Sequence, residues 1–438
     1  MAFASPDAPR VGIIGGGYAG LACGVELVKR GAQVAVFEGS RIMGGRARRV
    51  EKDDFQVDNG QHLLLGAYSE TLRLLRTVGV KPGIFDTRPM DLHYPGQLRL
   101  QAASLPAPLH LAVGLLRAEG MNWTERRAIL RFIQHLKKHR FRMPVQMTVA
   151  ELLERADQPD RICRYLWKPL CVAALNTPAH EASARVFATV LRDTLASGTA
   201  ASEMLLSRVD LSELFPVPAA RWIAMNGGQV YVTEPIARIV RDGQQFALEG
   251  DPSTTRGFDH VVIATAPYHV VDLICDLPEL APVRSAIDAF DYEPILTTYL
   301  QYDASVTLPG PMIGDVDGPA EWFFDRAKFG GPEGLIAGVI SARGPHMDMP
   351  RHEIELAMHN QLERILERQL PRPDEILSIV EKRATFACRP GLVRPTVRTA
   401  VPGVWLAGDY VDGPYPATIE GAVRSGVNCA REIMLRKT

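Results

Sequence analysis

The sequence predicts an α/β protein built around a largely parallel sheet, and two observations carry this prediction. Short, continuous apolar runs such as 11–14 (VGII) and 34–38 (VAVFE) are typical of strands that are covered on both faces. Helical patterns separate these runs, as in proteins made of βαβ units. The chain has 438 residues, of which 46% are hydrophobic, so its length and composition allow two domains with sizeable cores.

Residues 11–38 form the clearest βαβ unit. The sequence GGGYAG (15–20) between its strands fits the pattern GxGxxG, and we expect it to form a turn before a helix that Gly31 ends. Such glycines let the backbone approach a pyrophosphate, and Glu38 stands where an acid accepts hydrogen bonds from ribose hydroxyls. A merely structural glycine turn leaves Glu38 unexplained. The predicted dinucleotide site therefore contains Gly15, Gly17, Tyr18, Ala19, Gly20 and Glu38.

The elements that follow are predicted from hydrophobic periodicity. Helices are expected at 68–78, 125–140, 146–175, 351–370 and 416–435. Strands are expected at 260–267, 295–303, 321–326, 335–342 and 404–410, and a helix, glycine turn and strand at 215–232. After residue 38 the expected elements therefore fall into blocks of helices and blocks of strands.

Charge and cysteine content exclude several classes of function. The formal net charge is −1, which gives no reason to expect a nucleic-acid partner. The cysteines form no CxxC pair and no metal-binding cluster, so we expect free thiols in a reducing, cytoplasmic compartment. These six cysteines are Cys23, Cys163, Cys171, Cys275, Cys388 and Cys429.

Membrane contact is an open question at one segment. No run of about 18 apolar residues predicts a membrane span, and the N-terminus carries no signal-peptide pattern. The nearly uncharged stretch 105–116 (LPAPLHLAVGLL) is either a buried helix or a segment that touches a membrane surface.

Three further motifs resemble those of the amine oxidase and phytoene desaturase superfamily of flavoproteins, and the resemblance covers the whole chain. GGRAR (44–48) resembles its second FAD fingerprint, in which Gly44 and Gly45 pass close to the cofactor and Arg46 reaches toward phosphate. The segments 227–240 and 258–267 resemble its central FAD segment, where the backbone of Ile236 holds the adenine side. The resemblance implies FAD, bound non-covalently because no cysteine is placed to link the flavin.

The third motif is LAGDYVDGPYPATIEGAVRSG (406–426), which resembles the closing motif of the superfamily. There Gly408 gives close backbone approach, and Asp409 accepts a ribityl hydroxyl or contacts phosphate. A helix starting at Pro416, with Ala417 and Thr418, directs its positive end at the flavin.

Motifs so far apart in sequence imply a discontinuous cofactor domain. We expect a Rossmann-like FAD-binding domain made of residues 1–90, 215–280 and 385–438. Residues 91–214 and 281–384 then form a mixed α+β substrate domain, in the arrangement of the amine oxidases.

Within the superfamily, the segments on the substrate side are most similar to the bacterial hydroxysqualene dehydroxylases. DNGQH with the following LLLGAYSETLRLLRTVGV, LWKPLCVAALNTP, LSELFPVPAARWI, EKRATFA and the PATIEGAVRSG ending carry this similarity. The stretch 411–415 (VDGPY) departs from it, since a turn richer in hydroxyl groups and glycine is expected there.

The family resemblance implies reductive removal of the hydroxyl of hydroxysqualene, giving squalene for hopanoid synthesis. Protonation of the allylic hydroxyl releases water, and hydride from N5 of reduced FAD quenches the cation. The protein must supply a proton donor and a dry apolar channel. No second GxGxxG is present, so the electrons come either from free NAD(P)H or from a partner protein.

The candidate proton donors are His62, Asp58, Tyr410 and Tyr415. His62 is the first choice, because histidine titrates near neutrality, although it is equally suited to hold the DNGQH turn. Asp58 either orients this turn or is itself the acid, and Tyr410 either donates or packs beside the flavin. Asn176 is expected either to line the pocket or to end a helix.

Two other functions are compatible with the cofactor motifs. A desaturase of the carotenoid and phytoene type, using oxidised FAD on a polyene precursor, has the same fingerprints. A non-enzymatic carrier of isoprenoid groups, like the GDP-dissociation inhibitors, has the same fold but needs no intact FAD site. A colourless purified protein would favour the carrier, and an amine oxidase is disfavoured because only 7% of the residues are aromatic.

Overall fold

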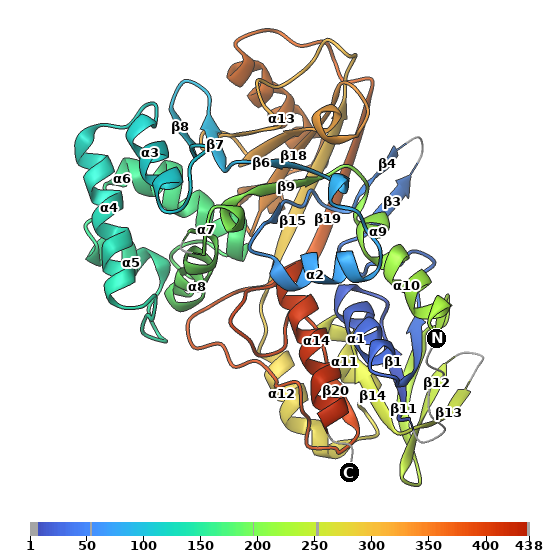
Figure 1. The fold of residues 1–438 in the computed structure, drawn as a ribbon. Helices are drawn as coiled ribbons and strands as arrows, with labels where there is room; N and C mark the ends of the chain where they lie inside the picture. The colour runs from blue at the N-terminus through green and yellow to red at the C-terminus, as the bar shows by residue number, and fades with distance from the viewer. Residues whose placement is uncertain (1–7, 53–54, 196, 251–253, 436–438) are drawn as a thin grey trace.

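The computed structural model describes residues 8–52, 55–195, 197–250 and 254–435 (Figure 1). A five-stranded parallel sheet lies at its centre, in the order β10-β2-β1-β14-β20. Its strands come from three distant parts of the chain, which confirms the predicted parallel α/β architecture. They are β1 (Arg10–Ile14), β2 (Gln33–Glu38), β10 (Gln229–Val232), β14 (His260–Ile263) and β20 (Val404–Leu406).

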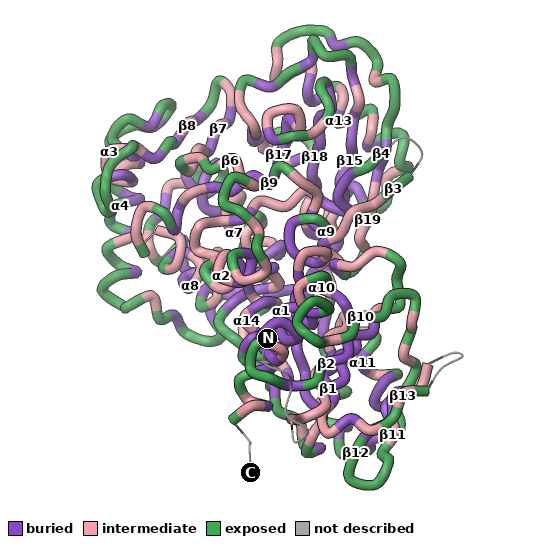
Figure 2. The backbone as a smooth tube through the Cα atoms, turned by 45° about the vertical axis from the view of Figure 1, so that its right-hand side comes forward, coloured by how far each residue is buried: buried purple, intermediate pink, exposed green. Residues whose placement is uncertain are grey.

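Both faces of this sheet are covered, which is why its strands are continuously apolar. On one face lie α1 (Tyr18–Lys29) and α14 (Ile419–Leu435), and the buried residues in Figure 2 gather along β1, β2 and these helices. The other face meets an antiparallel sheet of β11 (Ile236–Asp242), β12 (Gln245–Gly250) and β13 (Thr254–Phe258). Gly12 in β1 lies against this sheet, because a Cβ there would lie 2.9 Å from Leu248.

Helix α1 starts earlier than the sequence suggested. The amide of Leu21 donates to the carbonyl of Gly17 at 3.0 Å, so the helical hydrogen bonds begin inside the glycine motif and not after it. The prediction of a turn through Gly20 is therefore wrong. Gly20 is already helical, and a Cβ on it would lie 2.0 Å from the carbonyl oxygen of Gly15.

A second, antiparallel sheet has the order β16-β17-β18-β15-β19. The predicted strands at 295–303, 321–326 and 335–342 are confirmed in it, whereas β19 was not predicted. Helix α13 (Arg351–Leu366) packs on one face through Ile354, Met358 and Leu362, as its periodicity indicated. The strands are β15 (Tyr292–Gln301), β16 (Met312–Gly314), β17 (Trp322–Asp325), β18 (Leu335–Ser341) and β19 (Glu375–Phe386).

A helical lobe, on the left in Figure 1, follows the first part of the chain. Asn122 and Thr148 start its helices α4 and α5 with capping boxes. The predicted helix at 146–175 is wrong as a single element, because Asp157 has φ 48° and Pro159 removes a backbone donor. The main helices are α3 (Leu109–Arg117), α4 (Trp123–Lys138), α5 (Val149–Arg155), α7 (Lys168–Leu175) and α8 (Ala184–Leu195).

The C-terminal elements are shorter than expected. Strand β20 ends at Leu406 and not at 410, and α14 begins at Ile419 and not at Pro416. Thr418 explains the later start, since its Oγ1 accepts from the amide of Gly421 at 3.1 Å and so caps the helix. The predicted domain boundaries stay a prediction.

The remaining expectations concern membranes and cysteines. None of the helices among the described residues combines the length and the apolar character that a bilayer crossing requires. Cys275 is exposed, whereas the other five cysteines are buried thiols, Cys388 among them.

We predict that Gly426→Ala destabilises the protein by about 1–3 kcal/mol, because the new methyl group overpacks the contact between α14 and α1. A Cβ on Gly426 would lie 2.1 Å from the carbonyl oxygen of Ala19. Chemical denaturation of both proteins measures the loss. Gly83→Ala is the matched control, since a Cβ on Gly83 meets nothing within 4 Å. Equal losses in the two variants would contradict the packing argument.

Candidate functional site

One cavity of about 1110 Å³ extends from the carboxyl ends of the parallel strands to the second antiparallel sheet, β16-β17-β18-β15-β19. Ligands of α/β proteins bind at such strand ends. Pockets for a small molecule are usually about 300–1000 Å³, so this cavity is large for a ligand site. Of the predicted cofactor residues, Gly20 does not line the cavity, and the others do: Gly15, Gly17, Tyr18, Ala19, Glu38, Gly44, Gly45, Arg46, Ile236, Gly408, Asp409, Ala417 and Thr418.

The two N-terminal glycine motifs meet at one end of the cavity. The amide of Gly44 donates to the carbonyl of Gly16 at 3.0 Å, and a Cβ on Gly17 would lie 3.8 Å from the Cα of Gly45. Gly15 has φ +112°, and its Cβ would lie 2.7 Å from the carbonyl oxygen of Ala264. Side chains would fill this concave backbone surface, so its glycines fit the close approach of a pyrophosphate.

Glu38 lies beside this surface with its carboxylate held by the backbone. One oxygen accepts from the amide of Gly16 at 2.7 Å and the other from Ser40 at 2.8 Å. A carboxylate has about four acceptor positions, so two remain for ribose hydroxyls. Ile236 lies nearby, because the amide of Glu234 donates to the carbonyl of Glu38 at 2.9 Å.

Arg46 and Asp409 join the second motif to the closing motif. Their side chains form an ion pair of 2.5 Å, and Arg46 also donates to the carbonyl of Ala384 at 2.9 Å. Both line the cavity, so one cation and one carboxylate face the same space. The capped end of α14 lies there too, through Ala417 and Thr418, and favours negative charge. These residues fit the polar part of a flavin dinucleotide.

Apolar side chains predominate in the other part of the cavity. They come mainly from α7, α8 and the second antiparallel sheet, whose polar lining residues are Asn176, Thr194, Ser341, Glu381 and Thr385. This apolar arm suits a hydrocarbon chain and excludes water. Its lining includes Met90, Leu92, Leu170, Val172, Phe187, Val190, Leu191, Met204, Ile295, Met312, Trp322, Phe324 and Val339.

His62 is the one predicted catalytic residue that lines the cavity. Its Nδ1 lies 2.7 Å from the carbonyl oxygen of Gly60, which can only accept, so Nδ1 carries the proton and donates. Burial lowers the pKa of His62, and its ring is therefore neutral at pH 7. The expected hydrogen bond to the turn is present, and Nε2 is left as an acceptor.

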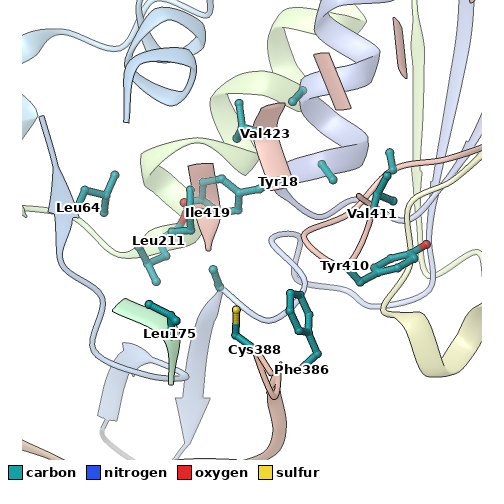
Figure 3. Packing of buried hydrophobic residues seen from close by; sticks show 14 of the residues in the cluster. Tyr18, Leu64, Leu175, Leu211, Phe386, Cys388, Tyr410, Val411, Ile419 and Val423 are labelled. Carbon is teal, nitrogen blue, oxygen red and sulfur yellow. Dashed lines mark hydrogen bonds between the residues drawn. The ribbon is translucent and has the colours of Figure 1, made fainter. Parts of the chain in front are cut away.

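Asp58 and Tyr410 are not among the residues that line the cavity. The Asp58 carboxylate accepts from the amide of Leu211 at 2.7 Å, while its carbonyl accepts from Tyr299 Oη at 2.9 Å. Tyr410 is fully buried among apolar side chains such as Phe386 (Figure 3), and its hydroxyl has no partner among the described residues. The geometry therefore favours packing roles for both, and their catalytic roles stay predictions.

Two further candidates have clear partners. The hydroxyl of Tyr415 donates to Asp193 at 2.5 Å and does not line the cavity. Asn176 does line it, and also ends α7 with φ 45°. Its amide donates to Thr385 Oγ1 at 3.0 Å and accepts from the amide of Ala342 at 2.8 Å, so it fulfils both alternatives at once.

Periodicity gave no sign of several polar residues in the wall, among them Tyr68, Thr265 and Tyr268. Tyr268 follows β14, and the position of residues after a parallel strand is the signal that would have found it. Tyr68 lies in the stretch after DNGQH, where the family resemblance pointed to the substrate side. The tertiary fold brings Tyr68, Thr265 and Tyr268 together in the wall of the cavity.

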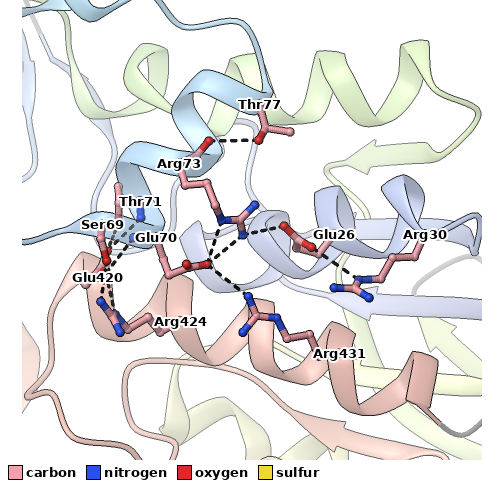
Figure 4. Close-up of polar contacts among 10 residues, drawn as sticks. All are labelled: Glu26, Arg30, Ser69, Glu70, Thr71, Arg73, Thr77, Glu420, Arg424 and Arg431. Carbon is pink, nitrogen blue, oxygen red and sulfur yellow. Dashed lines mark hydrogen bonds and ion pairs between the residues drawn. The ribbon is translucent and has the colours of Figure 1, made fainter.

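A buried carboxylate fixes this stretch against α14 (Figure 4). Glu420 is fully buried and accepts from the amides of Glu70 and Thr71 at 3.1 and 3.0 Å, at the start of α2 (Ser69–Thr77). Arg424 donates to the same carboxylate at 2.6 Å and to Ser69 Oγ at 2.8 Å. The segment that carries His62 and Tyr68 is thereby tied to the helix that faces the cofactor end.

Comparisons with known proteins agree with this geometry. The model of the family described as flavin containing amine oxidoreductase matches residues 18–434. Proteins named hydroxysqualene dehydroxylase are similar along their whole lengths. The protein from Sinorhizobium fredii is 27% identical over 98% of this chain and 99% of its own length. The protein from Rhodopseudomonas palustris is 29% identical over 97% of this chain and 98% of its own length. A solved putrescine oxidase shares the fold, with a TM-score of 0.75 and 15% identity over 98% of this chain and 99% of its own.

We predict that Asp58→Asn changes the pH dependence of stability. Burial raises the pKa of Asp58 to about 6, whereas an unfolded chain has about 3.9. Between these values only the folded state keeps the proton, so the stability that Asp58 contributes is full below pH 4 and lost as the pH rises to 6. The free energy of unfolding of the wild type, minus that of the variant, should fall across this window.

Denaturation at several pH values measures this difference. Asp86→Asn is the control, because Asp86 lies at a partly exposed ion pair with Arg88. A difference between wild type and Asp58→Asn that stays constant from pH 4 to pH 6 would contradict a buried, proton-retaining Asp58.

Proposed function

The chain belongs to the flavin containing amine oxidoreductases and is an FAD-dependent oxidoreductase, and from this premise we propose that it reductively dehydroxylates hydroxysqualene to squalene. The observation that carries the proposal is that one cavity has both a polar, glycine-lined part and an apolar arm. A dinucleotide suits the first part and an isoprenoid hydrocarbon the second. The relatives named hydroxysqualene dehydroxylase support the choice of substrate.

The apolar arm supplies the conditions that this reaction needs. FAD, when bound in its reduced form, supplies the hydride that replaces the hydroxyl group. An allylic cation is captured by any water beside it, so the wall of leucine, valine and aromatic side chains protects it by keeping the arm dry. Trp322 and Phe324 add aromatic faces to this wall, and such faces stabilise positive charge.

His62 is the residue that we propose to handle the proton. Its Nδ1–H is engaged by Gly60, which fixes the ring and leaves Nε2 as the atom that bonds the substrate hydroxyl. Protonation of Nε2 turns the ring into the acid that releases water. Because burial lowers the pKa of His62, this acid form is scarce at neutral pH and common at lower pH.

The substrate also bears on location. An isoprenoid of this size partitions into bilayers, so we include membrane contact through residues 105–116 in the proposal. Leu105, Leu109 and Leu116 of this stretch are exposed, which supports contact over the alternative of a buried helix. The electron donor is either free NAD(P)H or a partner protein.

The first test is anaerobic turnover. Purified protein with bound FAD is reduced by dithionite, mixed with hydroxysqualene in detergent, and followed by flavin absorbance and by mass spectrometry of squalene. We expect one squalene for each flavin reoxidised. Flavin that stays reduced, together with new double bonds made in a polyprenoid by the oxidised protein, would establish a desaturase instead. A protein that binds no flavin would favour the isoprenoid carrier.

A second prediction concerns the pH profile. We expect kcat to fall about tenfold per pH unit above the pKa of His62, which burial lowers, since only the protonated ring is an acid. His62→Gln should lower kcat by about 10²–10⁴-fold, keep its flavin absorbance and lose this dependence. His269→Gln, which changes another histidine of the cavity wall, should keep the profile. An unchanged profile in His62→Gln would show that another group donates the proton.

A further inference from the structure

Exposed apolar side chains gather in the helical lobe. Of the fourteen large apolar side chains that are exposed in the described part of the chain, six lie between residues 105 and 145. Trp123 at the start of α4 is 62% exposed, and Leu109 and Leu116 on α3 are more than half exposed. Soluble proteins seldom concentrate such residues on one short segment without a partner.

The same segment is strongly basic. Residues 105–142 contain eight Lys and Arg but only two Asp and Glu, although the whole chain has a formal net charge of −1. Among the described residues, no ion pair involves the six exposed cations between residues 127 and 142. These unpaired cations are Arg127, Arg131, Lys137, Lys138, Arg140 and Arg142.

The apolar and basic residues share one side of α4. Trp123 is exposed, and so are Arg127, Leu130 and Arg131, which lie four, seven and eight residues after it, on the same side of a helix. The opposite side, with Ile129, Phe132 and Leu136, is buried in the core. An exposed helix side that mixes tryptophan, leucine and arginine is typical of helices that lie in a membrane interface.

We propose that this α3–α4 surface, made of Leu105, Leu109, Leu116, Trp123, Arg127, Leu130 and Arg131, docks on a bilayer that contains anionic lipids. The exposed leucines and Trp123 enter the interface, and the arginines bind the headgroups. This inference rests on the proposed function for its purpose, since a lipophilic substrate is then collected from the bilayer. It deepens that proposal by naming α4 and the charge of the lipid.

The surface is joined to the wall of the cavity. His110 on the buried side of α3 bonds Ser202 Oγ through Nε2 at 3.2 Å, and Ser202 lines the cavity. Thr199 Oγ1 donates to the carbonyl of Leu105 at 3.3 Å. The segment 105–110 is thus hydrogen-bonded to the 199–202 turn, and that turn contributes Ser202 to the lining of the cavity.

Co-sedimentation with vesicles tests the docking surface, with the full protein carrying its FAD. We expect binding to phosphatidylcholine vesicles that contain phosphatidylglycerol, weak binding to phosphatidylcholine alone, and loss of binding as salt is raised. Arg127→Glu with Arg131→Glu should weaken binding at least about 30-fold. Leu109→Ser with Leu116→Ser should also weaken it, on both kinds of vesicle.

Matched controls lie on α13 and after it. Leu356→Ser changes an exposed leucine, and the double variant Arg351→Glu with Arg372→Glu reverses two exposed cations, so both variants should bind as the wild type does. Binding that is the same in the α4 variants and these controls would overturn the proposal. A concentration-dependent dimer, abolished by the same α3 or α4 changes, would also overturn it in favour of a second copy.

Turnover in detergent separates this inference from the proposed function. The α3 and α4 variants should keep the detergent rate within about twofold, because none of these residues lines the cavity. Vesicle binding without turnover would uphold the docking surface and refute the proposed reaction. Turnover without vesicle binding would do the reverse.

Discussion

The close contact between α1 and α14 is the constraint on which the site depends. Gly426 lies where any side chain would meet the carbonyl oxygen of Ala19, so the two helices touch through their backbones. One helix carries the first glycine motif and the other begins beside Asp409, and nearly four hundred residues separate them in sequence. Had either helix been pushed out by a side chain, Arg46 and Asp409 would no longer face the same space. The close packing of α1 on α14 is therefore also required to bring the cofactor-site residues together.

Buried polar contacts transmit this constraint to the substrate side. Glu420 satisfies the free amides at the start of α2, and a buried carboxylate needs such donors to be tolerated at all. Because α2 continues from the stretch that carries His62, the position of α14 also sets that of the histidine relative to the cofactor end. Asn176 acts in the same way between α7 and strands β15, β18 and β19. The hydrogen bonds of Glu420 and Asn176 each join segments whose contact hydrophobic periodicity cannot predict.

This explains which features the sequence could predict. The strands at 11–14 and 34–38, the glycine motifs and helix α13 depend on local patterns, and they are found where expected. The predicted helix boundaries were wrong where a single residue determines them. Asp157 ends a helix with its positive φ, and Thr418 caps the start of α14. Asp58 and Tyr410 were predicted as proton donors from their side-chain chemistry. Whether such a group can donate a proton depends on its burial and its hydrogen-bond partners, and tertiary contacts determine both. Tyr268 reached the wall only through the end of β14.

The proposed reaction needs a proton donor, and the apolar cavity is a poor environment for one. The cavity offers an apolar arm, which protects a cation, and dryness raises the cost of any charged acid that stands beside it. His62 shows this conflict directly, because the burial that keeps water out also lowers its pKa and keeps the ring neutral. Asp58, four residues before His62 in the sequence, shows the opposite response, because burial raises the pKa of its carboxyl group to about 6. In the proposed reaction, a site that protects the cation by excluding water therefore makes protonation costly, and a neutral group that is charged only briefly meets both requirements.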